Sequence, residues 1–413
     1  MNVLEINGPR LREDIEALSG IGRGANQGVF RTAFSDADMQ AREWLKKRIT
    51  DAQLDCYQDG AGNIFARLNW RDDSASVMTG SHIDSVPGGG YLDGALGVLA
   101  GLECLRRIKE LGLQPKRPLE AVAFSDEEGR FGGIFGSRAL CGHLSPDDIH
   151  AARDLDGITL VEAMANQGLN AMDALSASRR PDSIHGFVEL HIEQGPVLER
   201  QQLHLGAIEA IAGLYKWTVR LSGHAGHAGA TPMAMRRDPF QGLAEFSTAL
   251  PRILEEHGSP RSVATVGRVE LSPGAANVVP GLAEFSLDVR DTDGKILATL
   301  GDAMRRVLSA IARRRQLMFA FDVLSEIAPV KCDTKVIELI ERTARALGIN
   351  GTRMTSGAAH DSQIMASITP TGLIFIPSKG GRSHTPAEWS DWQDIENGAN
   401  VLLNTLYQLA NET

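Results

Sequence analysis

Apolar residues in the first half of the chain come in short runs that alternate with longer amphipathic stretches. The runs at 119–124 and 187–192 are continuous, as in buried strands. Ser35 has the side chain of a helix N-cap and stands before a stretch of helical periodicity. The pattern predicts strands at 54–58, 64–68, 77–79, 119–124 and 187–192, and helices at 35–49 and 94–111. Strands that alternate with helices are typical of an α/β sheet that is mostly parallel.

The pattern changes near Ala212 and changes back after Ala328. Between these points it predicts strands at 216–222, 263–271, 283–290 and 318–324, and helices at 235–254 and 295–315. This β-α-β-β-α-β order is that of ferredoxin-like folds. Afterwards helices at 334–347 and 394–409 flank a strand at 372–376. We therefore expect an α/β domain with a mixed sheet, formed by 1–211 and 329–413, interrupted by a smaller α+β ferredoxin-like domain at 212–328.

Composition and charge exclude several classes of function. The 413 residues carry 42 basic and 52 acidic side chains, a net charge of −10. An acidic balance argues against a nucleic-acid partner and against an anionic membrane surface. No apolar run reaches the ~18 residues of a membrane span, and the first residues lack the apolar segment of a signal peptide. Four scattered cysteines predict buried free thiols in a reducing compartment, so we expect a cytoplasmic protein.

Candidate chemistry is concentrated in five short segments at predicted strand ends or in glycine-rich turns. They are SHID at 81–84, YLDG at 91–94, DEEG at 126–129, ELHIE at 189–193 and SHTP at 383–386. Functional sites of open α/β sheets lie beyond the carboxyl ends of the strands. Imidazole and carboxylate together suit Zn²⁺, Mn²⁺, Co²⁺ or Ni²⁺. Each segment alone has an ordinary explanation, such as a structural histidine or a solvated acidic turn, but their combination favours a metal site.

The spacing within these segments suits a metal-dependent hydrolase. Asp84 follows His82 at the distance at which a carboxylate orients a metal-bound imidazole. The pair Glu127 and Glu128 lets one carboxylate bind metal while the other acts as a base, and Asp93 could bridge two cations. Other motifs fit less well: the glycines near residue 22 lack dinucleotide-binding spacing, 88–90 lacks a P-loop lysine, and no G-x-S-x-G nucleophile motif occurs.

The order SHID, LDG, EEG, HIEQG, GHAGATPM, NVVPG, SGAAHD and SHTPAEW resembles the hydantoinase/carbamoylase branch of the dinuclear-metal aminoacylase and carboxypeptidase superfamily. This branch includes N-carbamoyl-L-amino-acid hydrolases, allantoate and ureidoglycolate amidohydrolases and one type of β-ureidopropionase. The motifs extend from about residue 80 to 390. His191 in HIEQG marks this branch, because related peptidases have a carboxylate there.

The resemblance implies a role for each candidate residue. His82 and His191 would hold one divalent ion, Glu128 and His384 a second, and Asp93 would bridge them. Glu127 would be the general base. The inserted domain would be a lid and dimerisation domain, whose His227 would cross a homodimer interface to stabilise the oxyanion. Asn277 and Arg290 would grip the carboxylate of the substrate, with Gln194 and His360 close by. Without the resemblance, Arg290 reads as a surface arginine paired with Asp291 or Asp293.

The resemblance implies an amidohydrolase that cleaves the ureido C–N bond of N-carbamoyl-L-amino acids and releases amino acid, CO₂ and ammonia. Allantoate is the alternative substrate, because the motifs are common to both activities. Hydrolysis of N-acyl amino acids or dipeptides fits less well because of His191, and a non-catalytic binding role fits less well because every expected ligand and the base are present. The segment 128–133 is shorter than in many relatives, and Arg382 and Thr385 beside His384 differ from the commonest form, which leaves the substrate open.

Overall fold

The computed structural model describes residues 3–412 and divides the chain into two compact units. Unit 1 consists of Met1–Glu209, Lys331–Met354 and His360–Thr413. Unit 2 consists of Ala210–Val330 together with the short segment Thr355–Ala359. The domain boundaries expected from the sequence were 211/212 and 328/329. The segment Thr355–Ala359 had been placed in the larger domain.

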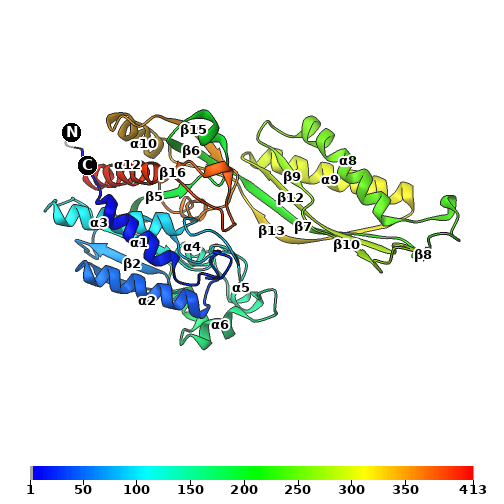
Figure 1. The fold of residues 1–413 in the computed structure, drawn as a ribbon, viewed down its shortest axis with the longest axis horizontal. Helices are drawn as coiled ribbons and strands as arrows, with labels where there is room; N and C mark the ends of the chain where they lie inside the picture. The colour runs from blue at the N-terminus through cyan, green and yellow to red at the C-terminus, as the bar shows by residue number, and fades with distance from the viewer. Residues whose placement is uncertain (1–2, 413) are drawn as a thin grey trace. The chain divides into compact units, whose positions relative to one another are not determined.

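Unit 1 is built on a mixed sheet with the strand order β1-β2-β4-β3-β5-β16-β6-β14, and β15 pairs with β6 (Figure 1). Its strands are β1 (Asp55–Gln58), β2 (Ile64–Leu68), β3 (Ser76–His82), β4 (Leu119–Phe124), β5 (Ile184–Ile192), β6 (Leu205–Ile211), β14 (Val330–Lys331), β15 (Gly351–Ser356) and β16 (Thr371–Ile376). β4, β3, β5 and β16 pair in parallel at the centre of the sheet, whereas β2 is antiparallel to β1 and β4, and β6 is antiparallel to β16. The mixed sheet is confirmed, and hydrogen bonds from His204 N to Asn350 O and from Ala212 N to Ser356 O show that β15 runs parallel to β6.

Helices cover both faces of this sheet. They are α1 (Gly8–Ser19), α2 (Asp36–Asp51), α3 (Ala95–Glu110), α4 (Phe135–Leu140), α5 (Pro146–Ala151), α6 (Leu160–Asn166), α7 (Val197–Gln201), α10 (Thr334–Ala346), α11 (Asp361–Met365) and α12 (Trp392–Asn411). Helix α3 packs on β3 and β4 with α12 beside it, while α4 and α11 lie against the opposite face. Small residues of α3 allow the close approach, since a Cβ on Gly101 would meet the Thr79 side chain at 2.9 Å. The central strands are thereby buried on both sides.

Unit 2 has the ferredoxin-like arrangement that the sequence predicts. Its sheet has the order β10-β12-β7-β13, with β9 also paired to β12, and α8 and α9 pack on it. The elements are β7 (Gly213–Ser222), β8 (Gly226–His227), α8 (Pro239–His257), β9 (Val263–Thr265), β10 (Val269–Ser272), β11 (Val278–Val279), β12 (Leu282–Asp291), α9 (Gly294–Arg315) and β13 (Met318–Ile327). A core of buried apolar side chains around Trp217, Phe246 and Phe285 fills the space between sheet and helices.

Two predictions in unit 2 were wrong in detail. The strand predicted at 263–271 is interrupted, because the Ser286 hydroxyl accepts a hydrogen bond from Arg268 N where a regular ladder would use a carbonyl. The helix predicted from residue 235 begins at Pro239, after a 3₁₀ turn at Met233–Met235 and with Asp238 as N-cap. Among the residues described, no helix combines the length and apolarity needed to cross a membrane.

Candidate metal centre

The carboxyl ends of the four parallel strands in unit 1 converge on one cluster of titratable side chains. His82 ends β3, His191 is the penultimate residue of β5, and Glu127 follows β4. The loop after β16 adds His384. Because β3, β4, β5 and β16 are neighbours, residues up to 300 positions apart come together here. This is the edge at which open α/β sheets place their functional sites.

The two carboxylate oxygens of Asp93 face different partners. Oδ1 lies 3.0 Å from His191 Nε2 and 3.7 Å from His82 Nε2. Oδ2 lies 3.3 Å from His384 Nε2, which is 3.5 Å from Glu128 Oε2. The carboxylate thus stands between two sets of donors, His82 with His191 and Glu128 with His384.

The backbone around Asp93 depends on a glycine. Gly94 adopts φ +64°, and a Cβ there would lie 2.3 Å from His82 Nε2. Only glycine combines this φ with so close an approach of an imidazole. Helix α3 starts at the next residue, so the turn that presents Asp93 is held directly against the His82 ring.

Burial and the repulsion between neighbouring carboxylates determine the pKa values of the acidic residues in this cluster. Burial, together with the neighbouring carboxylates, raises the pKa of Glu127 and of Glu128 well above the usual range. Glu127 Oε2 lies 3.5 Å from His82 Nε2. Burial would lower the pKa of His191, but the hydrogen bond and charge of Asp93 outweigh it and raise that pKa to about 9. A group of carboxylates in this setting is stabilised by added positive charge.

The carboxylate of Asp84 bonds to the main chain of Glu127 and Glu128 and lies farther from the ring of His82. Its carboxylate accepts hydrogen bonds from Glu127 N at 3.4 Å and Glu128 N at 3.2 Å. His82 Nδ1 lies 3.0 Å from the main-chain oxygen of Asp84 and 3.8 Å from the carboxylate. The closest partner of the His82 ring is therefore the main chain rather than the expected carboxylate. Burial raises the pKa of Asp84.

The donor set fits divalent metal ions. Ligand atoms of His82, Asp93 and His191 lie within 4.8 Å of one another, and so do those of Asp93, Glu128 and His384. Within the described residues, the buried Glu128 Oε1 has no hydrogen-bond partner, as expected of an oxygen that faces a cation. A third group formed by Glu189, His191 and His360 is a poor candidate, because both Glu189 oxygens accept bonds from the hydroxyls of Ser81 and Ser362.

Gln194 and His360 also lie at this cluster. Gln194 Nε2 donates to Asp93 Oδ2 at 2.7 Å, and its buried Oε1 has no partner among the described residues. The His360 ring packs edge-on against His191, with ring centroids 4.6 Å apart. Burial and the nearby His191 lower the pKa of His360 well below its usual range, so this ring is neutral.

The remaining candidates belong to unit 2, where two of them are neighbours. His227 in β8 pairs with Val278 of β11, and Ala228 N donates to Asn277 O at 2.9 Å. His227 Nδ1 accepts hydrogen bonds from Gly229 N and Ala230 N, both at 3.1 Å. A neutral imidazole whose Nδ1 accepts carries its proton on Nε2. The exposed edge of His227 is therefore a hydrogen-bond donor.

Arg290 lies at the other end of the same sheet. It pairs with Leu214 at the start of β7, whereas the turn carrying His227 and Asn277 lies beyond the pair Ser222 and Leu282. Arg290 Nε and Nη2 bind the two oxygens of Asp288 at 2.8 and 3.0 Å, and Nη1 donates to Gly357 O at 2.7 Å. The expected salt-bridge partners Asp291 and Asp293 were wrong, because Asp288 shares a strand face with Arg290 and Asp291 points the other way.

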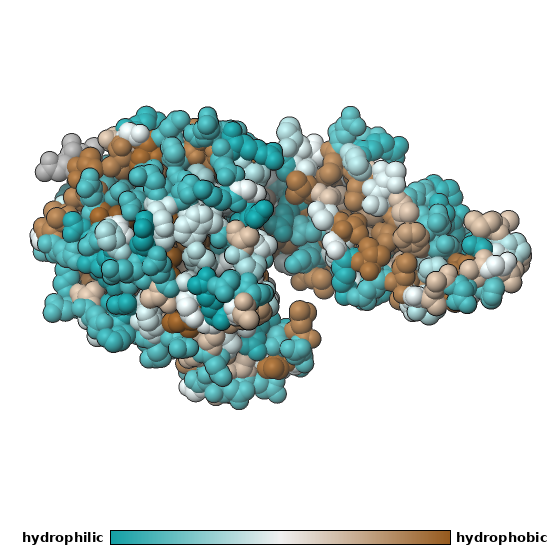
Figure 2. Space-filling view, viewed as in Figure 1, coloured by the Kyte–Doolittle hydropathy of each residue, from teal (hydrophilic) through white to brown (hydrophobic). Residues whose placement is uncertain are grey.

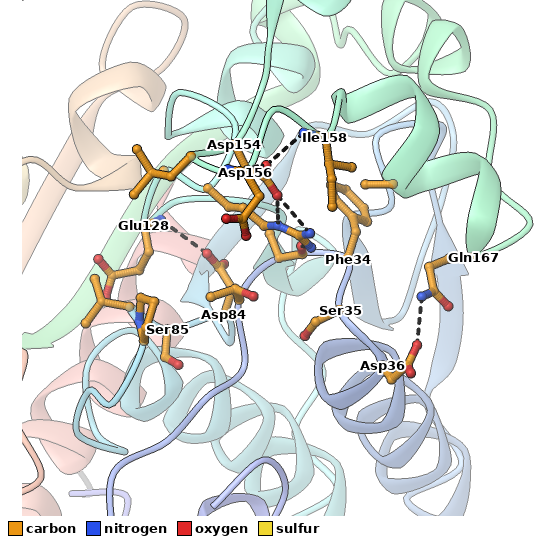
Figure 3. Close-up of a pocket in the computed structure, with 18 of the residues that line it drawn as sticks. Phe34, Ser35, Asp36, Asp84, Ser85, Glu128, Asp154, Asp156, Ile158 and Gln167 are labelled. Atoms are coloured by element: carbon orange, nitrogen blue, oxygen red, sulfur yellow. Dashed lines mark hydrogen bonds and ion pairs between the residues drawn. The ribbon is translucent and has the colours of Figure 1, made fainter. Parts of the chain in front are cut away.

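A pocket of about 640 Å³ adjoins the Asp84 and Glu128 corner of the cluster (Figure 3). The short segment after Glu128 forms one wall, where Arg130 bonds Asp154 through Nε at 3.1 Å and Nη2 at 3.0 Å. Phe34 and Ile158 line the pocket beside this pair, and Ile158 N donates to Asp154 Oδ1 at 2.9 Å. The segment 128–133, which the sequence singled out, thus borders a cavity next to the candidate centre.

Sequence reasoning missed Glu388 and Ser383. Glu388 is buried between the Asp93 and His384 loops, and Ser383 Oγ lies 2.9 Å from Asp93 Oδ2. Burial and then the charge of Asp93 raise the pKa of Glu388 to about 7. Both residues stand in the motif SHTPAEW, but only the fold reveals that Glu388 reaches back to the Asp93 loop.

The fold and the clustered imidazole and carboxylate ligands are those of a metal-dependent hydrolase. The chain belongs to peptidase family M20/M25/M40, whose sequence profile matches residues 78–408. It is 40% identical to an N-carbamoyl-L-amino acid amidohydrolase of Geobacillus stearothermophilus over 98% of this chain and 99% of the relative. It is 36% identical to the allantoate amidohydrolase of Escherichia coli over 97% of both chains. An amidase of the hydantoinase/carbamoylase family from Burkholderia multivorans has the same fold, with a TM-score of 0.89, 33% identity and 99% coverage of both chains. The protein is therefore an amidohydrolase of this family, acting on C–N bonds other than peptide bonds.

Proposed function

We propose that the protein hydrolyses the ureido C–N bond of N-carbamoyl-L-amino acids with two divalent ions in unit 1. The observation that carries the proposal is the position of Asp93, whose two oxygens face separate donor sets. His82, His191 and Asp93 Oδ1 would hold one ion, and Glu128, His384 and Asp93 Oδ2 the other. Zn²⁺, Mn²⁺, Co²⁺ and Ni²⁺ all suit these ligands. When bound, such ions make water more acidic and neutralise negative charge that develops on the substrate.

Glu127 is the proton carrier in this proposal. It lies beside His82, and burial, followed by the charges of the surrounding carboxylates, raises its pKa. Such a carboxylate readily takes the proton of the attacking water and returns it to the departing nitrogen. Release of ammonia leaves an N-carboxy amino acid, which loses CO₂. Gln194 Oε1, which has no partner among the described residues, is available to accept a bond from an N–H of the ureido group.

In this proposal, unit 2 supplies His227 for the negative charge that develops on the reacting oxygen and Arg290 for the carboxylate of the substrate. His227 presents Nε2–H and can donate to the oxygen of the tetrahedral intermediate. Arg290 has five N–H donors, of which three are used by Asp288 and Gly357. The two left over in the described residues are one on Nη1 and one on Nη2, a suitable pair for a carboxylate. Asp288 thus fixes the orientation of a guanidinium whose end is available to the α-carboxylate.

The separation of these groups supports a homodimer. Arg290 lies eight positions after Leu282 on β12, which corresponds to about 27 Å of strand. One amino acid derivative cannot span that distance, so His227 and Arg290 of the same chain serve different substrate molecules. We propose that His227 and Asn277 act on the substrate of a second copy, while Arg290 serves the substrate of its own chain. The resemblance implies that Asn277 grips the carboxylate together with Arg290 of the same chain. Because Asn277 lies beside His227, we propose instead that it acts, like His227, on the substrate bound by the other copy.

Exposed apolar side chains on unit 2 are consistent with a second copy packing there. Figure 2 shows hydrophobic surface on this unit, and the large side chains that are at least 42% exposed are Met233, Met235, Phe240, Val263, Val269, Met318, Val323 and Leu324. Apolar surface of this kind marks contact sites more often than chance.

The four cysteines are free, which supports the expected reducing, cytoplasmic environment.

Allantoate is the alternative substrate, favoured by the 36% identity to the allantoate amidohydrolase of Escherichia coli. The test is ammonia release by Mn²⁺-loaded protein from N-carbamoyl-L-methionine and from allantoate at equal concentration. Faster release from the carbamoyl amino acid is the expected result. Faster release from allantoate would replace the substrate but keep the site. No release from either, with metal shown to be bound, would overturn the proposed reaction.

A further inference from the structure

Glu388 joins the two loops that carry Asp93 and His384. Its Oε1 accepts hydrogen bonds from Leu92 N and Asp93 N, both at 3.0 Å. Its Oε2 accepts from Ser383 Oγ at 2.9 Å and from His384 N at 3.3 Å. Each oxygen thus serves one loop, although the loops are about 290 residues apart in the chain.

The surroundings of Glu388 are shaped to admit this side chain. Glu388 is only 2% exposed, and a Cβ on Gly90 would lie 2.2 Å from its carboxylate. Neither loop has regular secondary structure at Asp93 or His384, so backbone ladders do not fix them. His384 also adopts φ +56°, a conformation that needs support from its neighbours.

We propose that Glu388 is a positioning residue that sets the spacing between Asp93 and His384, and thereby the geometry of the second metal site. The inference rests on the metal roles proposed above for Asp93, Glu128 and His384. Glu388 itself touches neither substrate nor metal in this account. Partners behind metal ligands commonly contribute 10–100-fold to metal affinity, which sets the expected size of the effect.

The hydrogen-bond pattern requires a carboxylate and not only a side chain of this shape. All four partners donate, and a carboxylate can accept at both oxygens. In Glu388→Gln, the amide oxygen can still serve Leu92 and Asp93, but the NH₂ group then faces His384 N, which is also a donor. Ser383 can adapt, because its hydroxyl can accept from the amide and donate to Asp93 Oδ2. The substitution therefore releases His384 selectively while preserving volume.

The experiment measures Zn²⁺ affinity by competition with a chromophoric chelator, for wild type and Glu388→Gln. Two binding steps are expected in wild type. In the variant we expect one of the two steps to lose about 10–100-fold in affinity and the other step to change less than about threefold. A purely structural role of Glu388 would lower the melting temperature and leave both affinities of the folded protein unchanged. Two unchanged affinities would overturn the proposal.

Two further variants keep the test decisive. Glu103→Gln is the matched control: this carboxylate is also fully buried and accepts a main-chain bond from Asn7 N, but it lies about 12 Å along α3 from Ala95. It should leave both zinc affinities unchanged. In Gly90→Ala the added methyl group would displace the Glu388 carboxylate. This variant should weaken the same zinc-binding step as Glu388→Gln, and it replaces that variant in the test if Glu388→Gln misfolds. If zinc binding by Gly90→Ala matches wild type, the proposal fails. Because zinc affinity is the readout, a wrong substrate assignment would not affect this result.

Discussion

The candidate residues of the two units differ in how they are held. In unit 1 they gather beyond the ends of parallel strands, buried or half-buried except for the exposed His384, and they bond to one another, as Asp93 does to His191 and Gln194. In unit 2, His227 and Asn277 are exposed on a turn beyond the sheet, and Arg290 is a half-buried side chain at the opposite end. Residues of unit 1 therefore depend on each other, whereas those of unit 2 depend mainly on local hydrogen bonds.

This difference determines what a substitution disturbs. The carboxylates of unit 1 repel one another and are stabilised by cations, so changes in the proposed metal ligands affect metal binding and folding together. The exposed side chains of unit 2 contribute little to its core, which is built around Trp217 and Phe285. Substitutions in unit 2 should therefore change catalysis and leave metal content and stability intact.

The largest expected effect is that of Glu127→Gln. The amide cannot take a proton from water, so kcat should fall by about 10²–10⁴-fold or more, the range for general acid–base groups. Metal content should remain that of wild type, because Glu127 is not among the proposed ligands. Steady-state kinetics and elemental analysis of the same sample check both points. A kcat within a few-fold of wild type would show that another group is the base.

His227→Ala should give the next largest effect, a loss of about 10²–10³ in kcat as found for oxyanion donors. Melting temperature and metal content should not change, since His227 is exposed and, among the described residues, its side chain bonds to the main chain of its own turn. Loss of metal would instead place His227 among the ligands.

The same variant tests the exchange of His227 between copies. Co-expression of His227→Ala with Glu127→Gln produces mixed dimers in which one site has both an intact base and an intact histidine. Activity should recover to about a quarter of wild type, because half of the dimers are mixed and each has one complete site. If the mixture stays as inactive as its components, His227 acts within its own chain.

The smallest effect concerns the thiols, which all lie in unit 1. Burial raises the pKa of Cys141 and of Cys332 to about 12, so both stay protonated as the pH rises from 7 to 9. Labelling of these buried thiols then requires opening of unit 1. Removal of metal with a chelator should speed it by about tenfold, because bound ligand stabilises the closed state.

Labelling is followed by mass spectrometry at pH 8. Cys56, which is half-buried, is the internal reference, and its rate should not respond to the chelator. Equal labelling rates of Cys141 and Cys332 with and without chelator would show that metal binding does not stabilise unit 1.

Much of the fold could be predicted because the central strands are continuous apolar runs. The strand predicted at 119–124 matches β4 residue for residue, and the Ser35 cap is confirmed by its bond from Asp38 N. The segments with weak patterns were missed, among them the short helices α4, α5 and α6 and the strands β6 and β15. Their stability comes from tertiary packing, which periodicity does not report.

For the candidate centre, the sequence indicated the residue types at the strand ends, and the structure brings His82, Asp93, Glu127, Glu128, His191 and His384 together. Glu388 could not be found in this way, since an acidic residue four positions after His384 looks like a solvated turn. The opposite placement of Asn277 and Arg290 was also invisible, because it depends on the register of β12 against β7.

The ends of unit 2 have a practical consequence. Leu214 and Ile327 are paired on adjacent strands, so the main segment of the unit, Ala210–Val330, begins and ends at neighbouring points, and the short segment Thr355–Ala359 adds to it from elsewhere in the chain. A segment with adjacent ends and its own core is a self-contained module. Such a module can be expressed alone or exchanged between relatives, which would allow the self-association of the part carrying His227 and Arg290 to be measured without the metal-binding half.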